Sequence, residues 1–267
     1  MSHTIERFET IDSTQMHARR VIASGRGPGA ATAYVAAEQS GGVGRLGRAY
    51  ACPRGGLWLT LAVPFVGARP PADVLDGLGL RLGVACLGVL DAALAGADVP
   101  AATLKWPNDV LVDCGGRGKK VLGVLAEVVA GPASAGAATG DVGRGPGTSY
   151  ILVGVGINAN FAAAVLPEDL RERATTLADL VGHAVDLAAL ESDLIARLLE
   201  AMSTSGLPAA TLAVAQARLH GIGEEADITV PAGERVHGTL LGIDSRGFVR
   251  VRTQGGEEVV GMMPVEG

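Results

Sequence analysis

Three long apolar runs rich in β-forming residues most restrict the fold of this chain. They are GGLWLTLAVPF (55–65), KKVLGVLAEVVA (119–130) and SYILVGVGINANF (149–161). Runs of this kind, bounded by turn residues, predict largely buried strands. Residues 71–95 lie between the first two runs, and their apolar positions recur at helical spacing after Pro71, which predicts a helix. These strands and this helix predict an α+β domain with a sheet flanked by helices.

Other segments add to this outline. Residues 11–25, IDSTQMHARRVIASG, begin with good N-cap residues and end in glycine, which predicts a helix of about three turns. ATAYVAAE (31–38) predicts a strand, and helices are expected after Pro167. GPASAGAATGDVGRGP (131–146) has almost no bulky side chains, so we expect a mobile surface loop there.

The pattern changes near Gly221. From there to the C-terminus, short alternating strands and turns recur every eight to ten residues, which predicts a small all-β barrel or sandwich. We therefore expect one large domain over 1–219 and a small β domain over 220–267.

Composition limits the classes of function. The chain has 267 residues, 48% of them hydrophobic, with a net charge of −6. The negative charge argues against binding to nucleic-acid phosphates as the main activity. The polar N-terminus and the interrupted apolar runs predict neither a signal peptide nor a membrane span, so we expect a cytoplasmic protein. Three widely spaced cysteines (Cys52, Cys86, Cys114) predict reduced thiols without a metal site.

The segment TLKWPNDVLV (103–112) predicts a β-hairpin with a Pro-Asn-Asp turn. Only three of the 22 basic residues are lysines, and all three (Lys105, Lys119, Lys120) lie in or just after this hairpin. A compact ammonium differs chemically from a guanidinium fork. The cluster thus indicates either chemistry around 105–120 or a solvated hairpin, and the count leaves both open.

The segment GGVGRLGR (41–48) contains four glycines and two arginines. It lacks the lysine and hydroxyl residue that a Walker phosphate loop requires, and it precedes a strand. A short arginine-glycine RNA-binding segment is opposed by the net charge. A flexible loop that closes over an anionic ligand is the better interpretation, with a solvated turn as the alternative.

GVGINA (154–159) matches a loose dinucleotide-binding pattern, but it lies past the middle of the chain, and Pro167 would break any long helix after it. Glycines that let a ligand lie against a strand explain it better. The five histidines are scattered along the sequence, and no Ser-His-Asp or Cys-His pattern of a nucleophilic catalytic site is evident.

Taken together and in this order, the motifs resemble those of the biotin protein ligase family. The matching residues are Ser13-Thr14, Gln39 with GVGRLGR (42–48), KWPND (105–109), Lys120 with Gly123, and Gly154, Gly156 and Asn158. The resemblance covers nearly the whole chain. It implies a mixed β-sheet catalytic domain like that of class II aminoacyl-tRNA synthetases and biotin ligases, with an SH3-like C-terminal β-barrel.

Two positions depart from the family pattern: Gln15 stands where asparagine is usual, and Val43 where arginine is frequent. Many relatives carry an N-terminal helix-turn-helix that represses biotin genes. This sequence starts almost at the catalytic motifs, so a repressor role is not expected.

The resemblance implies that ATP activates biotin to biotinyl-5′-AMP and that biotin then passes to a lysine of a carrier protein. It assigns catalysis to Lys120 and Arg45. The implied biotin-binding residues are Ser13, Thr14, Gln15, Gln39, Gly42, Val43, Gly44, Arg45, Lys120 and Gly123. The implied ATP- or adenylate-binding residues are Arg45, Arg48, Asn108, Lys120, Gly156 and Asn158. Lys105 and Trp106 would build the wall that presents Asn108, and Lys119 would be solvated.

The same resemblance implies that ATP and biotin are substrates and that Mg²⁺ binds with ATP. It assigns no residue of the chain as a metal ligand. The implied partner is the biotin carboxyl carrier protein or domain of an acetyl-CoA- or pyruvate-type carboxylase, with neither nucleic acid nor membrane. A homodimer is possible. Two alternatives remain: a lipoate or octanoate ligase of the same fold, and a biotin-binding module without turnover.

Overall fold

The computed structural model describes residues 2–67, 70–132, 147–230, 233–261 and 263–264. The chain divides into two compact units, one formed by Met1–Ala72 with Val121–Ile195 and the other by Asp73–Lys120 with Ala196–Gly267. Strand β6 (Gly118–Ala130) and helix α6 (Leu187–Ser203) each pass from one unit into the other.

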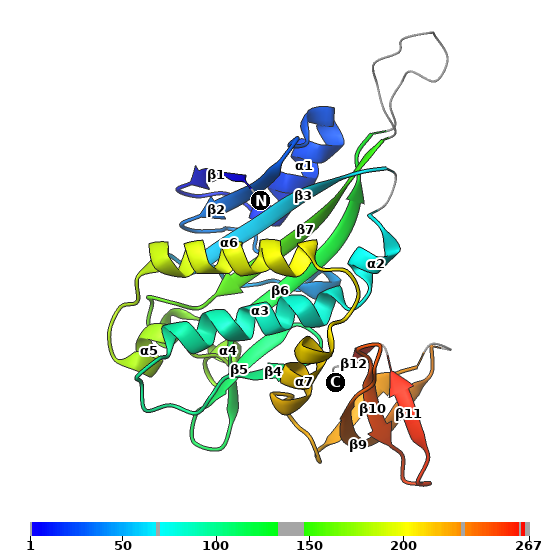
Figure 1. Cartoon of the computed structure of the whole chain (residues 1–267). Coiled ribbons are helices and arrows are strands. Elements are labelled where there is room, and N and C mark those ends of the chain that lie inside the picture. Colours follow the sequence, from blue (N-terminus) through cyan, green and yellow to red (C-terminus); the bar gives the residue numbers. More distant parts are fainter. Residues whose placement is uncertain (1, 68–69, 133–146, 231–232, 262, 265–267) are drawn as a thin grey trace. The chain divides into compact units, whose positions relative to one another are not determined.

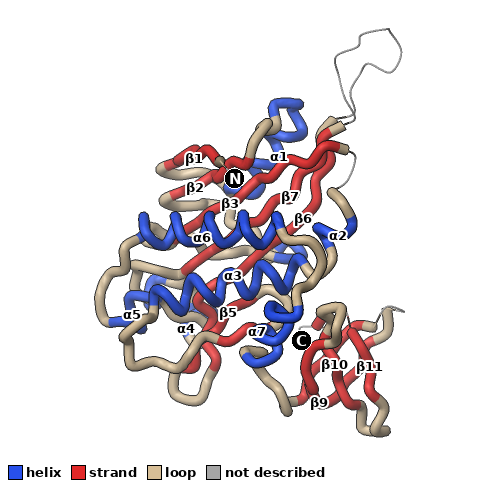
Figure 2. The backbone as a smooth tube through the Cα atoms, viewed as in Figure 1, coloured by secondary structure: helices blue, strands red, loops and turns tan. Residues whose placement is uncertain are grey.

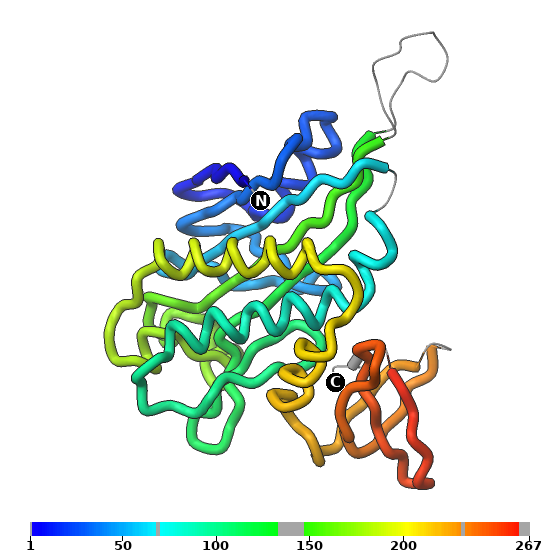
Figure 3. Tube along the Cα trace, in the orientation of Figure 1, coloured from blue at the N-terminus to red at the C-terminus, as the bar shows by residue number. Residues whose placement is uncertain are grey.

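The first unit is built on a mixed sheet (Figure 1; strands red in Figure 2). Strands β1 (His3–Phe8) and β2 (Ala31–Ala36) pair in parallel, and β3 (Leu57–Val66), β7 (Thr148–Ile157) and β6 continue the sheet antiparallel. The full strand order is β1-β2-β3-β7-β6-β5-β4. Figure 3 shows β3 beside β7, although the two strands are far apart in the sequence.

Helix α1 (Thr14–Val21) covers one face of this sheet, and a single π-helical turn, η1 (Ile22–Arg26), follows it. The Ser13 side chain accepts from the Met16 amide, so it caps the helix. Within this turn Gly25 has φ 76°, a left-handed conformation that suits glycine. Ala18 and Ile22 pack with Tyr34, Tyr150 and other apolar side chains of the sheet.

The remaining short elements of the first unit lie around the ends of these strands. They are η2 (Arg45–Gly47), η3 (Ala163–Val165), α4 (Glu168–Arg171) and α5 (Leu177–Val181). Trp58 of β3 packs there with Phe161, Leu166 and Cys52, and its ring nitrogen donates to the Pro53 carbonyl.

The second unit contains α2 (Ala72–Leu75), whose first residue belongs to the other unit, together with α3 (Leu78–Ala93) and α7 (Ala209–Ala217). Strands β4 (Thr103–Lys105) and β5 (Asp109–Asp113) form the expected hairpin, with a cis Trp106–Pro107 bond in the turn. Buried Arg81 donates to backbone carbonyls of Val74, Asp76, Ala201 and Gly206. It thereby links α2 and the residue after it to the end of α6 and the loop that follows α6.

The C-terminal segment forms a second, antiparallel sheet in the order β11-β10-β9-β8-β12. Its strands are β8 (Glu225–Thr229), β9 (Arg235–Ile243), β10 (Val249–Arg252), β11 (Glu258–Gly261) and β12 (Met263–Pro264). The two edge strands, β11 and β12, are separated by one residue in the sequence. The sheet must therefore curl strongly, as expected for a barrel-like domain.

The structure confirms the predicted α+β class and the separate C-terminal β-sheet. The helix expected over 71–95 is instead two helices, because Gly77 takes a left-handed conformation at φ 66° between them. Strand β1 was not predicted, since its polar and exposed sequence lacks an apolar face. The domain boundary between 219 and 220 stays a prediction, and residues 133–146 of the predicted loop lie outside the described residues.

Candidate active site

Three glycines lie side by side on the face of the sheet that α1 covers. In β7, Gly154 lies opposite Thr60 of β3, and Gly156 lies opposite Trp58. Gly123 of β6 lies opposite Gly156. Directly paired residues project to the same face of a sheet. Side chains are thus missing from neighbouring strands near the level of Thr60, so other groups can approach the backbone closely there.

The space above two of these glycines is occupied by other side chains. A Cβ at Gly154 would lie 2.6 Å from Oε1 of Gln15, and one at Gly156 would lie 2.8 Å from the Tyr50 ring. The Tyr50 hydroxyl also donates to the Gly156 carbonyl at 3.3 Å. Both glycines are therefore needed to seat polar side chains against β7.

The start of α1 contributes three buried polar residues: Ser13, Thr14 and Gln15. Thr14 contacts Gln39 twice, through its amide (2.6 Å) and its hydroxyl (2.9 Å), both to Gln39 Oε1. Its hydroxyl also lies 2.8 Å from that of Thr60. Gln39 Nε2 donates to Cys52 Sγ. Both polar ends of the Gln39 amide thus have partners within the chain.

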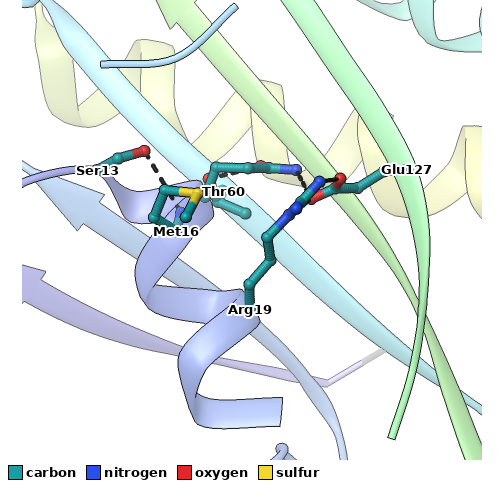
Figure 4. A network of polar contacts seen from close by, with 6 residues as sticks. Ser13, Met16, Arg19, Thr60 and Glu127 are labelled. Carbon is teal, nitrogen blue, oxygen red and sulfur yellow. Dashed lines mark hydrogen bonds and ion pairs between the residues drawn. The ribbon is translucent and has the colours of Figure 1, made fainter. Parts of the chain in front are cut away.

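Gln15 continues this network toward β6, as Figure 4 shows for Thr60, Arg19 and Glu127. The Gln15 Oε1 atom accepts from the Thr60 hydroxyl at 3.1 Å, and its Nε2 donates to Glu127 Oε1 at 2.7 Å. Arg19 forms a two-pronged ion pair with Glu127, which raises the pKa of the guanidinium. Thr60, Glu127 and Arg19 were not predicted from the sequence, although Glu127 is the single acid in the mainly apolar strand β6.

The glycine-arginine loop folds back on itself. The Gly44 amide donates to the Arg48 carbonyl, and the Tyr50 amide donates to the Gly42 carbonyl. Val43 and Ala49 form an isolated antiparallel β-bridge. At the tip, Arg45–Gly47 form one 3₁₀ turn in which Leu46 has φ 56° and is 82% exposed. A non-glycine residue in this region costs conformational energy. Gly42 is packed so closely against Tyr50 and Cys52 that a Cβ would clash.

Burial dominates the chemistry of Cys52. Loss of solvent around the thiol raises its pKa to about 12, and the contact with Gln39 offsets only part of that rise. The neutral thiol is therefore the resident form near neutral pH. It donates and accepts hydrogen bonds beside the polar wall formed by Thr14, Gln15, Gln39 and Thr60.

The predicted residues of the second unit lie on and beside the KWPND hairpin. The Lys120 ammonium is 2.8 Å from Asp109 Oδ1, and the two side chains are 29% and 19% exposed. Asn108 is half-buried in the turn, Lys105 is exposed, and Lys119 is half-buried. Trp106 donates its ring N–H to the Gly247 carbonyl at 3.1 Å, which favours a structural role for this residue.

The predicted nucleotide-side residue Asn158 is buried in the first unit. Its side-chain Nδ2 donates to the Thr175 carbonyl, and its backbone amide donates to Val121. The side chain thus holds the segment after β7 in place. Contact between Asn158 and a nucleotide stays a prediction.

The described part of the chain offers neither a metal-binding cluster nor a membrane-spanning helix. No group of three or more His, Cys, Asp or Glu residues there is arranged to hold a metal ion. Among the same residues, no helix combines the length and apolarity needed to cross a bilayer.

The α+β fold carries a polar wall beside a glycine-lined sheet face, and comparison with known proteins identifies the family. Residues 9–140 match the biotin/lipoate A/B protein ligase family model. The biotin–[acetyl-CoA-carboxylase] ligase of Paracoccus denitrificans is 33% identical over 235 residues, covering 85% of this chain and 86% of the relative. The chain therefore belongs to the biotin/lipoate A/B protein ligase family, and it is a ligase.

Two further relatives agree with this assignment. The bifunctional ligase/repressor BirA of Bacillus spizizenii is 29% identical, in an alignment that covers 93% of this chain and 69% of the relative. The structure of a biotin protein ligase from Aquifex aeolicus in complex with biotin and ATP aligns with a TM-score of 0.71 at 25% identity, covering 97% and 96% of the two chains. The resemblance drawn from the motifs is confirmed.

Proposed function

We propose that this ligase activates biotin with ATP and transfers it to a lysine of a biotin carboxyl carrier protein or domain. The observation that carries the proposal is the network of buried Thr14 and Thr60 with half-buried Gln39, beside the glycines of β6 and β7. A neutral ureido ring on an apolar chain requires a few fixed donors and acceptors beside apolar surface. The names of the relatives from Paracoccus and Aquifex support the same substrate.

In the first step a carboxylate oxygen of biotin bonds to the α-phosphorus of ATP, and the bond to the β-phosphate oxygen breaks to release pyrophosphate. Two anions must approach, and unit charges about 4 Å apart repel by roughly 4 kcal/mol at an effective dielectric near 20. We assign Arg45 and Lys120 to this charge, with Mg²⁺ entering as part of the MgATP substrate. The biotin carboxylate is already ionised at neutral pH, so this step needs no general base.

In the second step the amine of the acceptor lysine attacks the acyl carbon, loses a proton, and displaces AMP. The acyl adenylate is a mixed anhydride that water destroys, so the loop around Arg45 and Arg48 is assigned to shield it. Asn108, Gly156 and Asn158 are proposed for the nucleotide side. We propose the cytoplasm as the site of the reaction, since ATP and carboxylase carrier domains are found there, and a homodimer stays a prediction.

The decisive experiment follows pyrophosphate release and label transfer with labelled biotin, ATP and Mg²⁺, with and without a carrier domain. We expect biotin-dependent pyrophosphate release and a labelled carrier lysine. The matched family also contains lipoate ligases, so parallel reactions use lipoate and octanoate. Turnover with these acids but not with biotin would overturn the substrate, and biotin binding without pyrophosphate release would establish a module without turnover.

A further inference from the structure

The Arg19–Glu127 ion pair lies at one end of the polar wall and controls the orientation of Gln15. A carboxylate only accepts hydrogen bonds, whereas a glutamine amide has one donating and one accepting end. Glu127 Oε1 lies 2.7 Å from the Gln15 amide nitrogen. A flipped Gln15 would direct its carbonyl oxygen at the carboxylate, and the two would repel. Glu127 therefore fixes which end of Gln15 faces Thr60.

The Arg19 contacts hold Glu127 in that position. The Arg19 Nε donates to Glu127 Oε1 at 2.7 Å, and Nη2 contacts Glu127 Oε2 (Figure 4). A bidentate arginine pair restricts the rotation of a carboxylate. The Glu127 side chain is only 16% exposed, so water competes weakly for its oxygens.

The orientation of Gln15 decides where the Thr60 hydroxyl proton points. Gln15 Oε1 accepts the Thr60 proton at 3.1 Å, and a hydroxyl has only one proton to give. Thr60 therefore has no proton left to donate to Thr14 in their 2.8 Å contact. The Thr14 hydroxyl lies within hydrogen-bond distance of both Thr60 and Gln39 Oε1 and gives its one proton to either, so in both cases it accepts none from Thr60.

We propose that Glu127, clamped by Arg19, is a positioning residue that sets the hydrogen-bond polarity of this wall. Because Thr60 donates to Gln15 and Gln15 donates to Glu127, Thr60 cannot donate to Thr14, and the lone pairs of Thr14 Oγ1 are left to accept a hydrogen bond. The matching ligand group is an N–H donor, such as a ureido N–H of biotin. This inference rests on the proposed function. It also gives a role to Gln15, which lies beside Gly154 and is longer than the asparagine usual at this position in the family.

The test is a double-mutant cycle on the full chain, read as the biotin Kd by isothermal titration. Glu127→Gln allows the Gln15 amide to flip, so we expect the Kd to rise about tenfold or more, the cost of a misplaced buried hydrogen bond. Gln15→Glu sets two carboxylates against each other and should weaken binding at least as much. The double variant exchanges the two groups, so the amide at position 127 donates to the carboxylate at position 15, which still accepts from Thr60. The Kd should return to within about threefold of the parent.

The control is Glu258→Gln, which removes a strand glutamate paired with Arg250 and Arg252 in the C-terminal sheet. Its biotin Kd should stay within about twofold of the parent, as for most surface ion pairs. The ATP Kd should also be unchanged in Glu127→Gln. Unfolding temperatures of all variants separate positioning from stability, because a purely structural role would give no rescue in the double variant.

Two results overturn the positioning role: a Glu127→Gln Kd within about twofold of the parent, or losses in the double variant that simply add. The parent itself tests the proposed function. A parent that binds lipoate but not biotin removes both proposals, because a dithiolane ring has no N–H to donate.

Discussion

The Lys120 ammonium lies 2.8 Å from Oδ1 of Asp109, the last residue of the KWPND motif. The buried Oδ1 atom accepts no hydrogen bond of good geometry from the described residues, so the ammonium supplies its compensating charge. Lys120 is thereby held at the base of the hairpin. Its neighbour Lys119 would point to the opposite face of a regular strand.

Because Lys120 is the lysine paired with Asp109 in this way, substitutions at Lys120 and Lys119 should have different effects on adenylate formation. Lys120→Ala should slow adenylate formation at least several hundred-fold, or about 3–4 kcal/mol, typical of losing one preorganised contact to a transition state. Lys120→Arg should also be poor, because the wider fork does not replace a point charge. Lys119→Ala should remain within about a few-fold of the parent. Initial rates of pyrophosphate release, with unfolding temperatures as the control, decide the assignment; a severe defect in Lys119→Ala and a mild one in Lys120→Ala would reverse it.

Arg45 at the tip of the folded loop should retain the intermediate. We expect Arg45→Gly to bind biotinyl-5′-AMP more weakly, by about tenfold or more, since a charge-assisted contact is lost. Activated biotin would then escape and label bystander lysines. The measurement is the rate of adenylate release, together with labelling of an added unrelated protein. Labelling confined to the carrier domain, with normal retention, contradicts the role.

The same loop should be protected by ligand. Its tip holds Arg45 and Arg48 around the exposed, strained Leu46, so trypsin should cut there in the ligand-free protein. Biotin with ATP should slow this cleavage, because a closing loop loses the extended conformations that a protease needs. Fragment masses over time provide the measurement, and equal cleavage in both states argues against closure.

Gly156 should tolerate no side chain. An added Cβ would lie 2.8 Å from the Tyr50 ring, so Gly156→Ala must displace that ring and the wall around it. We expect the KM for ATP to rise about tenfold or more, because a misplacement of about 1 Å near a reacting site can cost up to roughly a hundredfold. Gly79→Ala in α3 is the matched control, because its Cβ meets nothing within 4 Å. An unchanged KM in Gly156→Ala would remove this glycine from the nucleotide side.

The Cys52 thiol should resist alkylation in the folded protein. Its pKa is raised to about 12 by burial, from an ordinary value of 9.0. The folded state holds this proton more tightly, so its stabilising effect is complete below pH 9.0 and is lost as the pH rises toward about 12. At about pH 8.5, iodoacetamide should modify the half-buried Cys114 first and Cys52 only after unfolding. Peptide mapping measures the order, and early labelling of Cys52 would show that its site opens.

The sequence by itself determined the outline and the family. Long apolar runs predicted β3, β6 and β7, since the pattern of a buried strand is local. Motifs such as KWPND and GVGRLGR carried the family assignment, because each is contiguous along the chain. The helix break at Gly77 was not foreseen, since glycine is tolerated in many helices and only the packing shows the left-handed turn.

Only the tertiary structure decided which polar groups meet. The contact between Gln15 and Glu127 joins residues 112 positions apart, and the pairing of Gly123 with Gly156 depends on strand register. Polar β1 became a strand because β2 offered it an edge to pair with. Local sequence sets propensity and pattern, whereas hydrogen-bond polarity depends on donors and acceptors that long-range folding brings to within about 3 Å.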